Sequence, residues 1–217
     1  MNASEIKGSP MGSVPLSTEQ KDVLNELINI GFGRAASSLS MLVNQRILLN
    51  VPQVQICALE QIADSLKELS HSDLAIIHQM FHGKLNGHAM LLLDICSAST
   101  LLDLMNGGTG TEQFEPLLPI DQEALAEIGN IVVNAFLGAF GNLLKIHLSF
   151  TIPSIMIETL GQMLQSFLIN ENHSFAMIFK IRFQLSQQNV SGYLVIILGG
   201  QPLEVLLKSL IQEGMIP

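Results

Sequence analysis

Two segments of helical periodicity in this chain carry the same polar pattern, and this repetition restricts the possible folds more than any other feature. In each segment an acidic residue is followed four positions later by Glu and three positions after that by Asn; the two triplets are Asp22, Glu26, Asn29 and Glu123, Glu127, Asn130. A proline follows each Asn after the same gap, so Pro52 and Pro153 are displaced by 101 positions (153 − 52), as the two Asn residues are (130 − 29). Such a repeat is typical of one structural unit used twice.

The order of predicted elements also repeats. Each half is expected to contain helix, strand, helix, strand, strand and helix, in this order. In the first half these elements are expected at about 18–44, 46–59, 60–69, 75–81, 87–93 and 96–105. In the second half they are expected at about 119–145, 147–157, 158–168, 174–184, 190–198 and 202–213. Pro52 and Pro153 interrupt the first strand of each half, which predicts an edge strand or a bulge. We therefore expect an α/β (α+β) fold in which two αβαββα units form a pseudo-two-fold body with a shared β-sheet.

The domain organisation follows from composition along the chain. Residues 1–16 are rich in Ser, Gly, Pro and Asn, which predicts a flexible leader. Residues 17–217 are expected to form a single domain of two repeats, about 18–110 and 117–213. The glycine-rich run 106–110 between them is typical of a helix C-cap followed by a linker.

Charge and hydropathy exclude several classes of protein. Ten Lys and Arg against 19 Asp and Glu give a net charge of −9, which disfavours nucleic-acid binding through phosphates. Hydrophobic residues make up 48% of the chain, yet no window of about 18 residues is free of polar breaks, so we expect a large core and no membrane insertion. Cys57 and Cys96 fit buried thiols in a reducing compartment. We expect a cytoplasmic protein, and a monomer because no long apolar seam remains.

The two polar triplets are expected to face solvent. At about 100° per residue, each triplet covers an arc of roughly 60° on one side of its helix. The apolar residues centre on the opposite side; they are Leu24, Ile28, Ala35 and Leu42 in the first helix and Leu125, Val132, Phe136 and Leu143 in the second. One Glu-x2-Asn on a helix is ordinary surface, but Asn disfavours helix interiors, so its recurrence at the same offset favours a function.

Glycines follow the first triplet. Gly31 and Gly33 each cost up to about 1 kcal/mol in a helix interior. Gly33 lies on the polar face, where the missing side chain would let another surface come close. Close helix packing or a kink explains it equally well. The second copy has Asn134 at this position, so the two polar faces differ.

The pattern Asp/Ser-x3-Glu-x2-Asn-x22-Pro, present twice, resembles the motif of the CheC/CheX/FliY phosphatases of bacterial chemotaxis. The resemblance covers about residues 18–213. FliY-type members are similar but carry a further C-terminal flagellar-switch domain, and CheX-type members have one working motif. With two motifs and an end at Pro217, this chain resembles the free-standing CheC type.

The resemblance implies hydrolysis of the aspartyl phosphate on a phosphorylated CheY-like response regulator. Asn29 and Asn130 would orient the attacking water in line with phosphorus. Glu26 and Glu127 would engage the regulator's active-site lysine and hold the two proteins in register. These four residues are the candidate catalytic residues.

Three further residues are expected to contact the partner: Asp22, Glu123 and Gly33. Glu123 departs from the family pattern, which has Asp or Ser there, and its additional methylene is expected to alter docking at the second site. The two prolines are expected to be structural, shaping the strand beside each helix.

The chemistry fits these residue types. Transfer of an activated acyl phosphate passes through a loose transition state, so the reaction needs a positioned water more than a strong base. A neutral amide both donates to and accepts from water, and it does not repel an anionic phosphoryl group. The regulator would bring Mg²⁺, so no metal site or cofactor of the chain's own is expected. The histidines, His78, His82 and His88 among them, are read as ordinary surface residues.

Two other functions remain open. FliM-type switch proteins are similar duplicated scaffolds without the Glu/Asn pairs, so a non-enzymatic FliM-like scaffold is the first alternative. CheC-type proteins also bind the receptor deamidase CheD, which makes a CheD-binding regulatory adaptor the second; no residues are assigned to that contact. A nucleotide site at Gly31-Phe32-Gly33 is set aside, because the strand–loop–helix order and a lysine are missing.

Overall fold

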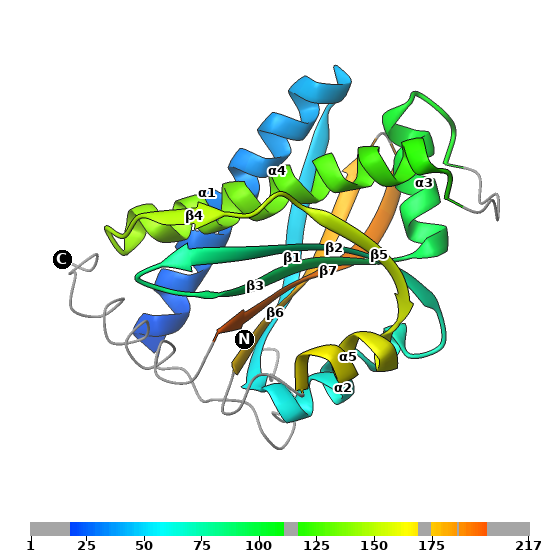
Figure 1. Ribbon diagram of the computed structural model, residues 1–217. Coiled ribbons are helices and arrows are strands. Elements are labelled where there is room, and N and C mark those ends of the chain that lie inside the picture. Colours follow the sequence, from blue (N-terminus) through cyan, green and yellow to red (C-terminus); the bar gives the residue numbers. More distant parts are fainter. Residues whose placement is uncertain (1–17, 111–116, 169–174, 186, 199–217) are drawn as a thin grey trace, which may run out of the picture.

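A computed structural model describes residues 18–110, 117–168, 175–185 and 187–198 of the chain (Figure 1). The first half contains α1 (Thr18–Val43), β1 (Ile47–Ala58), the short helix α2 (Ile62–Ser65) between 3-10 turns at Leu59–Gln61 and Lys67–Leu69, β2 (Asp73–Gly83), β3 (Gly87–Asp94) and α3 (Ile95–Met105). The second half contains α4 (Pro119–Leu143), β4 (Leu148–Phe150), β5 (Ser154–Thr159), α5 (Leu160–Leu168), β6 (Phe175–Leu185) and β7 (Gln188–Leu198). The predicted leader at 1–16 and the predicted last helix at 202–213 lie outside the described residues.

The element order agrees with the sequence-based expectation, and the strands join in one antiparallel sheet. Its order is β1-β6-β7-β3-β2-β4, and β5 follows β4 along the same edge of β2. The order reads the same from both sides of the central β3–β7 contact: β2 and then β4/β5 on one side, β6 and then β1 on the other. This is the pseudo-two-fold arrangement with a shared sheet.

The edge strands are exchanged between the halves. β1 of the first half pairs with β6 of the second, whereas β4 and β5 of the second half pair with β2 of the first. Neither half could therefore complete its part of the sheet alone.

Each proline lies at a bulge in an edge strand, as predicted. In β1, Asn50 and Gln53 are three residues apart, but their partners on β6, Arg182 and Lys180, are only two residues apart (53 − 50 against 182 − 180). Between β4 and β5, residues 150 and 154 are four residues apart, but their partners on β2, residues 81 and 78, are only three residues apart. One additional residue is thus accommodated at Pro52 and at Pro153, because proline cannot donate to the ladder.

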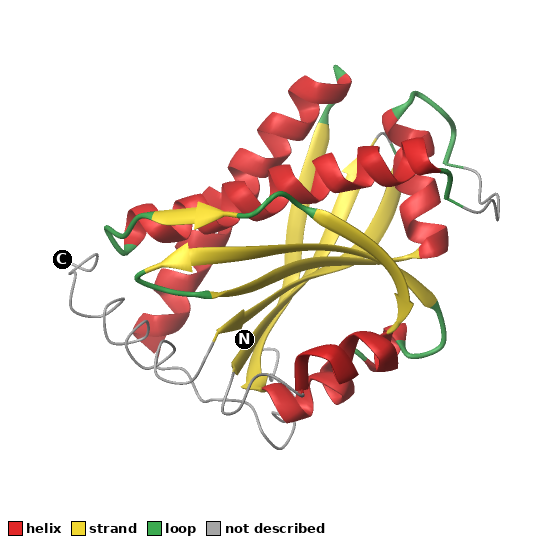
Figure 2. Cartoon of the chain, viewed as in Figure 1, coloured by secondary structure: helices red, strands yellow, loops and turns green. Residues whose placement is uncertain are grey.

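The helices cover both faces of the sheet (Figure 2). Residues of α1, α3 and α4 form one apolar cluster with one face, and residues of α2 and α5 form a second cluster with the other face. Successive residues of β2 alternate between them: Ile77 packs in the first cluster and Ile76 in the second. The layer of α1 and α4 carries both polar triplets.

The crossing of α1 and α4 is closely packed. A Cβ atom on Gly31 would lie 3.1 Å from the Cα atom of Phe136, so glycine lets the two helices approach. Beside it, the rings of Phe32 and Phe136 have centroids 5.2 Å apart, and the Phe136 ring packs in a tilted arrangement at 4.7 Å from that of Phe179 of β6. Close packing therefore accounts for Gly31.

Burial on the two helices follows the predicted pattern with one exception. Leu24, Ile28 and Ala35 are buried on α1, but Leu42 is 55% exposed, contrary to expectation. Leu42 lies in the last turn of α1, which projects beyond the rest of the helix layer (Figure 1), and its neighbour Met41 is exposed as well.

Helix α4 is long and apolar enough to cross a membrane by length and composition alone. In this fold, 56% of its most apolar window is buried inside the protein. Leu125, Val132 and Phe136 are each 0% exposed, as predicted for the core-facing side. Core packing thus explains the apolar composition of α4.

His78 on β2 and His88 on β3 differ from the expectation of ordinary surface residues, whereas His82 on β2 is exposed as expected. His78 Nε2 lies 2.9 Å from His88 Nδ1, and both side chains are partly buried. The two are diagonal neighbours across the β2–β3 ladder, where His78 faces Met90 and His88 faces Met80. Burial, and then the nearby His88, lowers the pKa of His78 to about 4.

This pair predicts a pH dependence of stability. Because His78 is neutral in the folded protein and has an ordinary pKa of 6.5 when unfolded, the unfolded chain binds more protons between these values. The stability associated with neutral His78 is thus present above pH 6.5 and lost as the pH falls toward 4. We expect the urea midpoint to fall less in His78→Gln than in the wild type when the pH is lowered from 7 to about 4.5. Equal falls would contradict the assignment.

Candidate functional site

The first triplet lies on the outer side of α1. Asp22, Glu26 and Asn29 are exposed, as predicted, whereas Leu24 and Leu27 on the opposite side are buried. Within the described part of the chain, no hydrogen bond to the Asn29 side chain is present. The Asn29 amide is therefore accessible to an approaching partner.

A groove runs beside Asn29, with a volume of about 620 Å³. It is lined by Asn25, Ile28, Asn29, Phe32 and Gly33 of α1, by Leu49, Asn50, Val51 and Pro52 of β1 and by Arg182 of β6. Pro52 and Asn29 thus border the same groove, Pro52 from the bulge of β1 and Asn29 from α1. Arg182 adds a positive charge to this groove.

Close packing does not explain Gly33. Among the described residues, no atom outside the adjoining helix backbone lies within 4 Å of the position that a Cβ atom would occupy on Gly33. The residue is exposed and borders the groove beside Asn29. The missing side chain of Gly33 leaves open space beside the Asn29 amide, and a partner could approach there.

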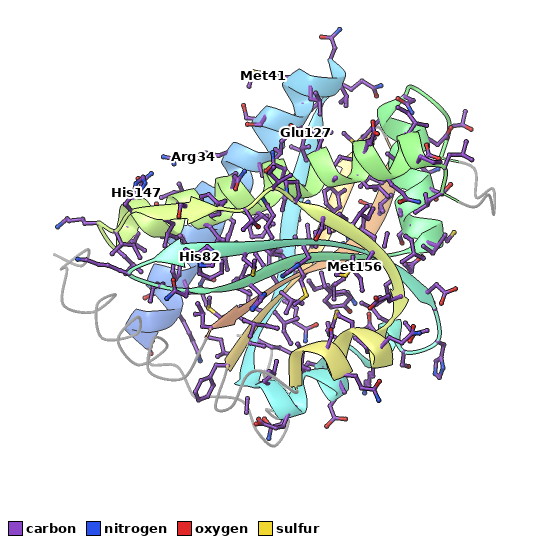
Figure 3. All side chains as sticks on the ribbon, viewed as in Figure 1. Arg34, Met41, His82, Glu127, His147 and Met156 are labelled. Atoms are coloured by element: carbon purple, nitrogen blue, oxygen red, sulfur yellow. The ribbon has the colours of Figure 1, made fainter. Side chains whose placement is uncertain are left out.

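The second triplet lies on the same helix layer, on α4. Glu123 and Glu127 are exposed, but Asn130 is only partly exposed, so the expectation that it fully faces solvent is met in part. Figure 3 shows Glu127 on α4 and Arg34 on α1, both on the layer that the two helices form. The second candidate pair is therefore placed beside the neighbouring helix.

Hydrogen bonds hold the Asn130 amide. Its Oδ1 accepts from Asn134 Nδ2 at 2.6 Å and from Gln79 Nε2 at 3.1 Å. Its Nδ2 donates to Glu127 Oε2 at 3.4 Å, the upper end of hydrogen-bond distance. The predicted Glu–Asn pair is thus a contact in the second copy. The bond from the buried Gln79 explains why Asn130 is drawn toward the protein.

A second groove, of about 520 Å³, adjoins Asn130 and lies between α1 and α4. It is lined by Arg34, Ser37, Ser38, Asn130, Ile131, Asn134 and Ala135. The second site therefore combines residues of both repeated helices, because their crossing brings Arg34 of the first beside the amide of the second. A surface of amides, hydroxyls and one guanidinium suits an anionic group.

Sequence reasoning missed three of these neighbours. Gln79 lies in an apolar strand and belongs to no motif, so only its unusual polarity within β2 could have singled it out. Arg34 and Arg182 reach the grooves through tertiary contacts that leave no local signal. Among the described residues, no group of three or more His, Cys, Asp or Glu is placed to hold a metal ion.

Comparison with known proteins found a family model and curated relatives that match this chain. The model of the CheC-like family matches residues 19–56, which include Asp22, Glu26, Asn29 and Pro52. The curated protein "CheY-P phosphatase CheC" of Bacillus subtilis is 24% identical over 185 residues, which cover 82% of this chain and 88% of that protein. The chain is therefore similar to the CheC-like family. The "flagellar motor switch phosphatase FliY" of Bacillus subtilis is 30% identical over 115 residues, 53% of this chain and 29% of that protein.

Solved structures share the fold of this chain. FliY of Thermotoga maritima superposes with a TM-score of 0.71 at 21% identity, over 92% of this chain and 99% of that one. A chain of the FliG–FliM complex of H. pylori superposes with a TM-score of 0.61 at 16% identity, over 89% of this chain and 100% of that one. At such identities the likeness concerns the fold alone.

Proposed function

We propose that this CheC-like protein is a phosphatase that hydrolyses the aspartyl phosphate of a CheY-like response regulator in chemotaxis signalling. The observation that supports it most is the presentation of a carboxylate and an amide, one helical turn apart, on the outer side of both α1 and α4. Each helix is fixed by a buried opposite face, so these groups are held with little freedom. The relatives named CheY-P phosphatase and switch phosphatase support the same substrate class.

The proposed mechanism assigns water positioning to the amides. Asn29 or Asn130 would hold a water in line with the phosphorus of the docked regulator, and Glu26 or Glu127 would bind the regulator's lysine. Asp22, Gly33 and Glu123 would contact the regulator around these pairs. Positioning converts an encounter with bulk water into a reaction of prealigned groups, which is effective for a loose phosphoryl transition state. Mg²⁺ would be carried by the regulator, and the protein would act as a cytoplasmic monomer.

A receiver-domain assay tests the proposal. CheY-like receiver domains are phosphorylated with a small acyl phosphate, freed of the donor and mixed with the protein at about one tenth of their concentration. We expect faster phosphate release with multiple turnovers. If no receiver domain loses phosphate faster in the presence of the protein, the phosphatase proposal is wrong.

A scaffold is the second candidate, because FliM shares the fold without being named an enzyme. It would bind a partner without accelerating phosphate release, so binding measured in the same mixtures separates the two functions. A contact with CheD stays a prediction to which no residue is assigned.

A further inference from the structure

Gln79 has a buried polar side chain, which is 1% exposed. It lies on the face of β2 that packs against α4. Its neighbours on that face, Ile77 and Phe81, are both core residues. Gln79 Nε2 donates to Asn130 Oδ1 at 3.1 Å and to the backbone oxygen of Thr151 at 3.0 Å. Its Oε1 is buried and finds no hydrogen-bond partner in the described part of the chain. An apolar residue would cost less here, because a buried amide that is only partly satisfied is destabilising.

The hydrogen bonds of Gln79 determine which way the Asn130 amide points. The Thr151 carbonyl can only accept, so the end of Gln79 that faces it must be the NH₂ group. That same NH₂ group reaches Asn130, which must therefore turn its oxygen inward. The Asn130 NH₂ group is then directed to the exposed Glu127 carboxylate, which also only accepts. Both ends of this chain of hydrogen bonds require the same orientation.

The first site lacks this support. Val54 and Ile155 are equivalent positions of the two halves, because they are 101 residues apart. In the sheet Val54 pairs with Phe179 and Ile155 pairs with Ile77, so Ile77 and Phe179 are equivalent as well, at a displacement of 102 (179 − 77). By the same displacement Gln79 corresponds to Ile181 (79 + 102), which is buried and apolar. Asn134, the other donor to Asn130, corresponds to Gly33 (134 − 101). Asn29 therefore has neither of the groups that orient its counterpart.

We infer that Gln79 is a positioning residue, which holds the Asn130 side chain with its NH₂ group toward the attacking water. This inference rests on the proposed phosphatase function. Gln79 and Asn134 occupy the two acceptor positions of Asn130 Oδ1, so Asn130 contacts water as a donor. The second site is thus oriented before the regulator binds, whereas Asn29 is oriented by the docked regulator.

The test uses variants in which one site works at a time. Gln79→Met retains the length and flexibility of the side chain and removes its hydrogen bonds. In an Asn29→Ala background, where the second site acts alone, we expect Gln79→Met to lower kcat about 10-fold with little change in KM, because misplacing a reacting group reduces the rate of the chemical step. In an Asn130→Ala background the same change should cause no further loss.

Asn134→Ala provides a second variant at a helix position that tolerates alanine, and we expect a smaller fall in kcat, again only in the Asn29→Ala background. Equal losses in both backgrounds would mean that Gln79 merely supports the fold and would overturn the inference, as would an unchanged kcat in the Asn29→Ala background. If Asn130→Ala itself leaves the rate of the wild type unchanged while Asn29→Ala abolishes it, the positioning inference fails and the phosphatase function stands. If the wild type itself does not accelerate phosphate release, the proposed function fails.

Discussion

Replacing Asn29 and Asn130 together by alanine should lower the rate of regulator dephosphorylation on the order of 10²-fold or more, comparable to the loss of one preorganised polar group in other active sites. Each amide is proposed to hold the attacking water, and alanine leaves no group at that position to do so. The measurement is single-turnover loss of phosphate from a receiver domain with the wild type, each single variant and the double variant. The single variants report what each site contributes.

Asn142→Ala is a matched control, because Asn142 is an exposed asparagine of α4 that lines neither groove. It should leave the rate unchanged. An unchanged rate in the double variant would mean that the two amides do not position the attacking water, whereas a wild type that does not accelerate phosphate release would favour the scaffold. A loss confined to Asn29→Ala would mean that Glu123 has impaired the second site, whereas a loss confined to Asn130→Ala would mean that an unoriented Asn29 does not catalyse.

Phe136→Ala should lower the free energy of unfolding by about 3–5 kcal/mol, the usual cost of removing a fully buried aromatic side chain. Phe136 is 0% exposed and contacts Phe32 of α1 and Phe179 of β6. Phe136 of α4 therefore packs against both the other site-bearing helix and the sheet. Urea unfolding followed by circular dichroism measures the loss.

The control for this substitution is Phe150→Ala, at a half-buried position on the short edge strand β4, where a smaller loss is expected. A loss below about 1 kcal/mol for Phe136→Ala would contradict the described crossing, because truncating a well-packed core aromatic costs more than that. Since the crossing sets the relative positions of both sites, we also expect Phe136→Ala to reduce phosphatase activity below the temperature at which it unfolds.

Much of the fold could be predicted because its signals are local. Helical periodicity defined α1 and α4 within about two residues, and Pro52 and Pro153 marked the edge-strand bulges. The strand exchange could not be predicted, because β1 pairs with β6 more than 100 residues away and periodicity carries no information on partners. The exposure of Leu42 likewise depends on where α4 crosses α1.

The candidate site was predictable as far as the repeated motif extends. Glu26 and Asn29 are exposed as the helical spacing predicts, and Glu127 and Asn130 lie in contact. The inward turn of Asn130 could not be foreseen, because it results from Gln79 on a strand 51 positions earlier in the sequence. The roles of these residues stay predictions until the variants are measured.

The exchanged edge strands have a consequence for how the two sites can change over time. An assembly of two identical subunits would carry every substitution at both places at once. Here the halves interlock as such a pair would, yet one covalent chain encodes them separately. One amide has supporting neighbours, whereas its counterpart has a glycine beside it, so a single molecule holds two versions of the same surface that are free to specialise.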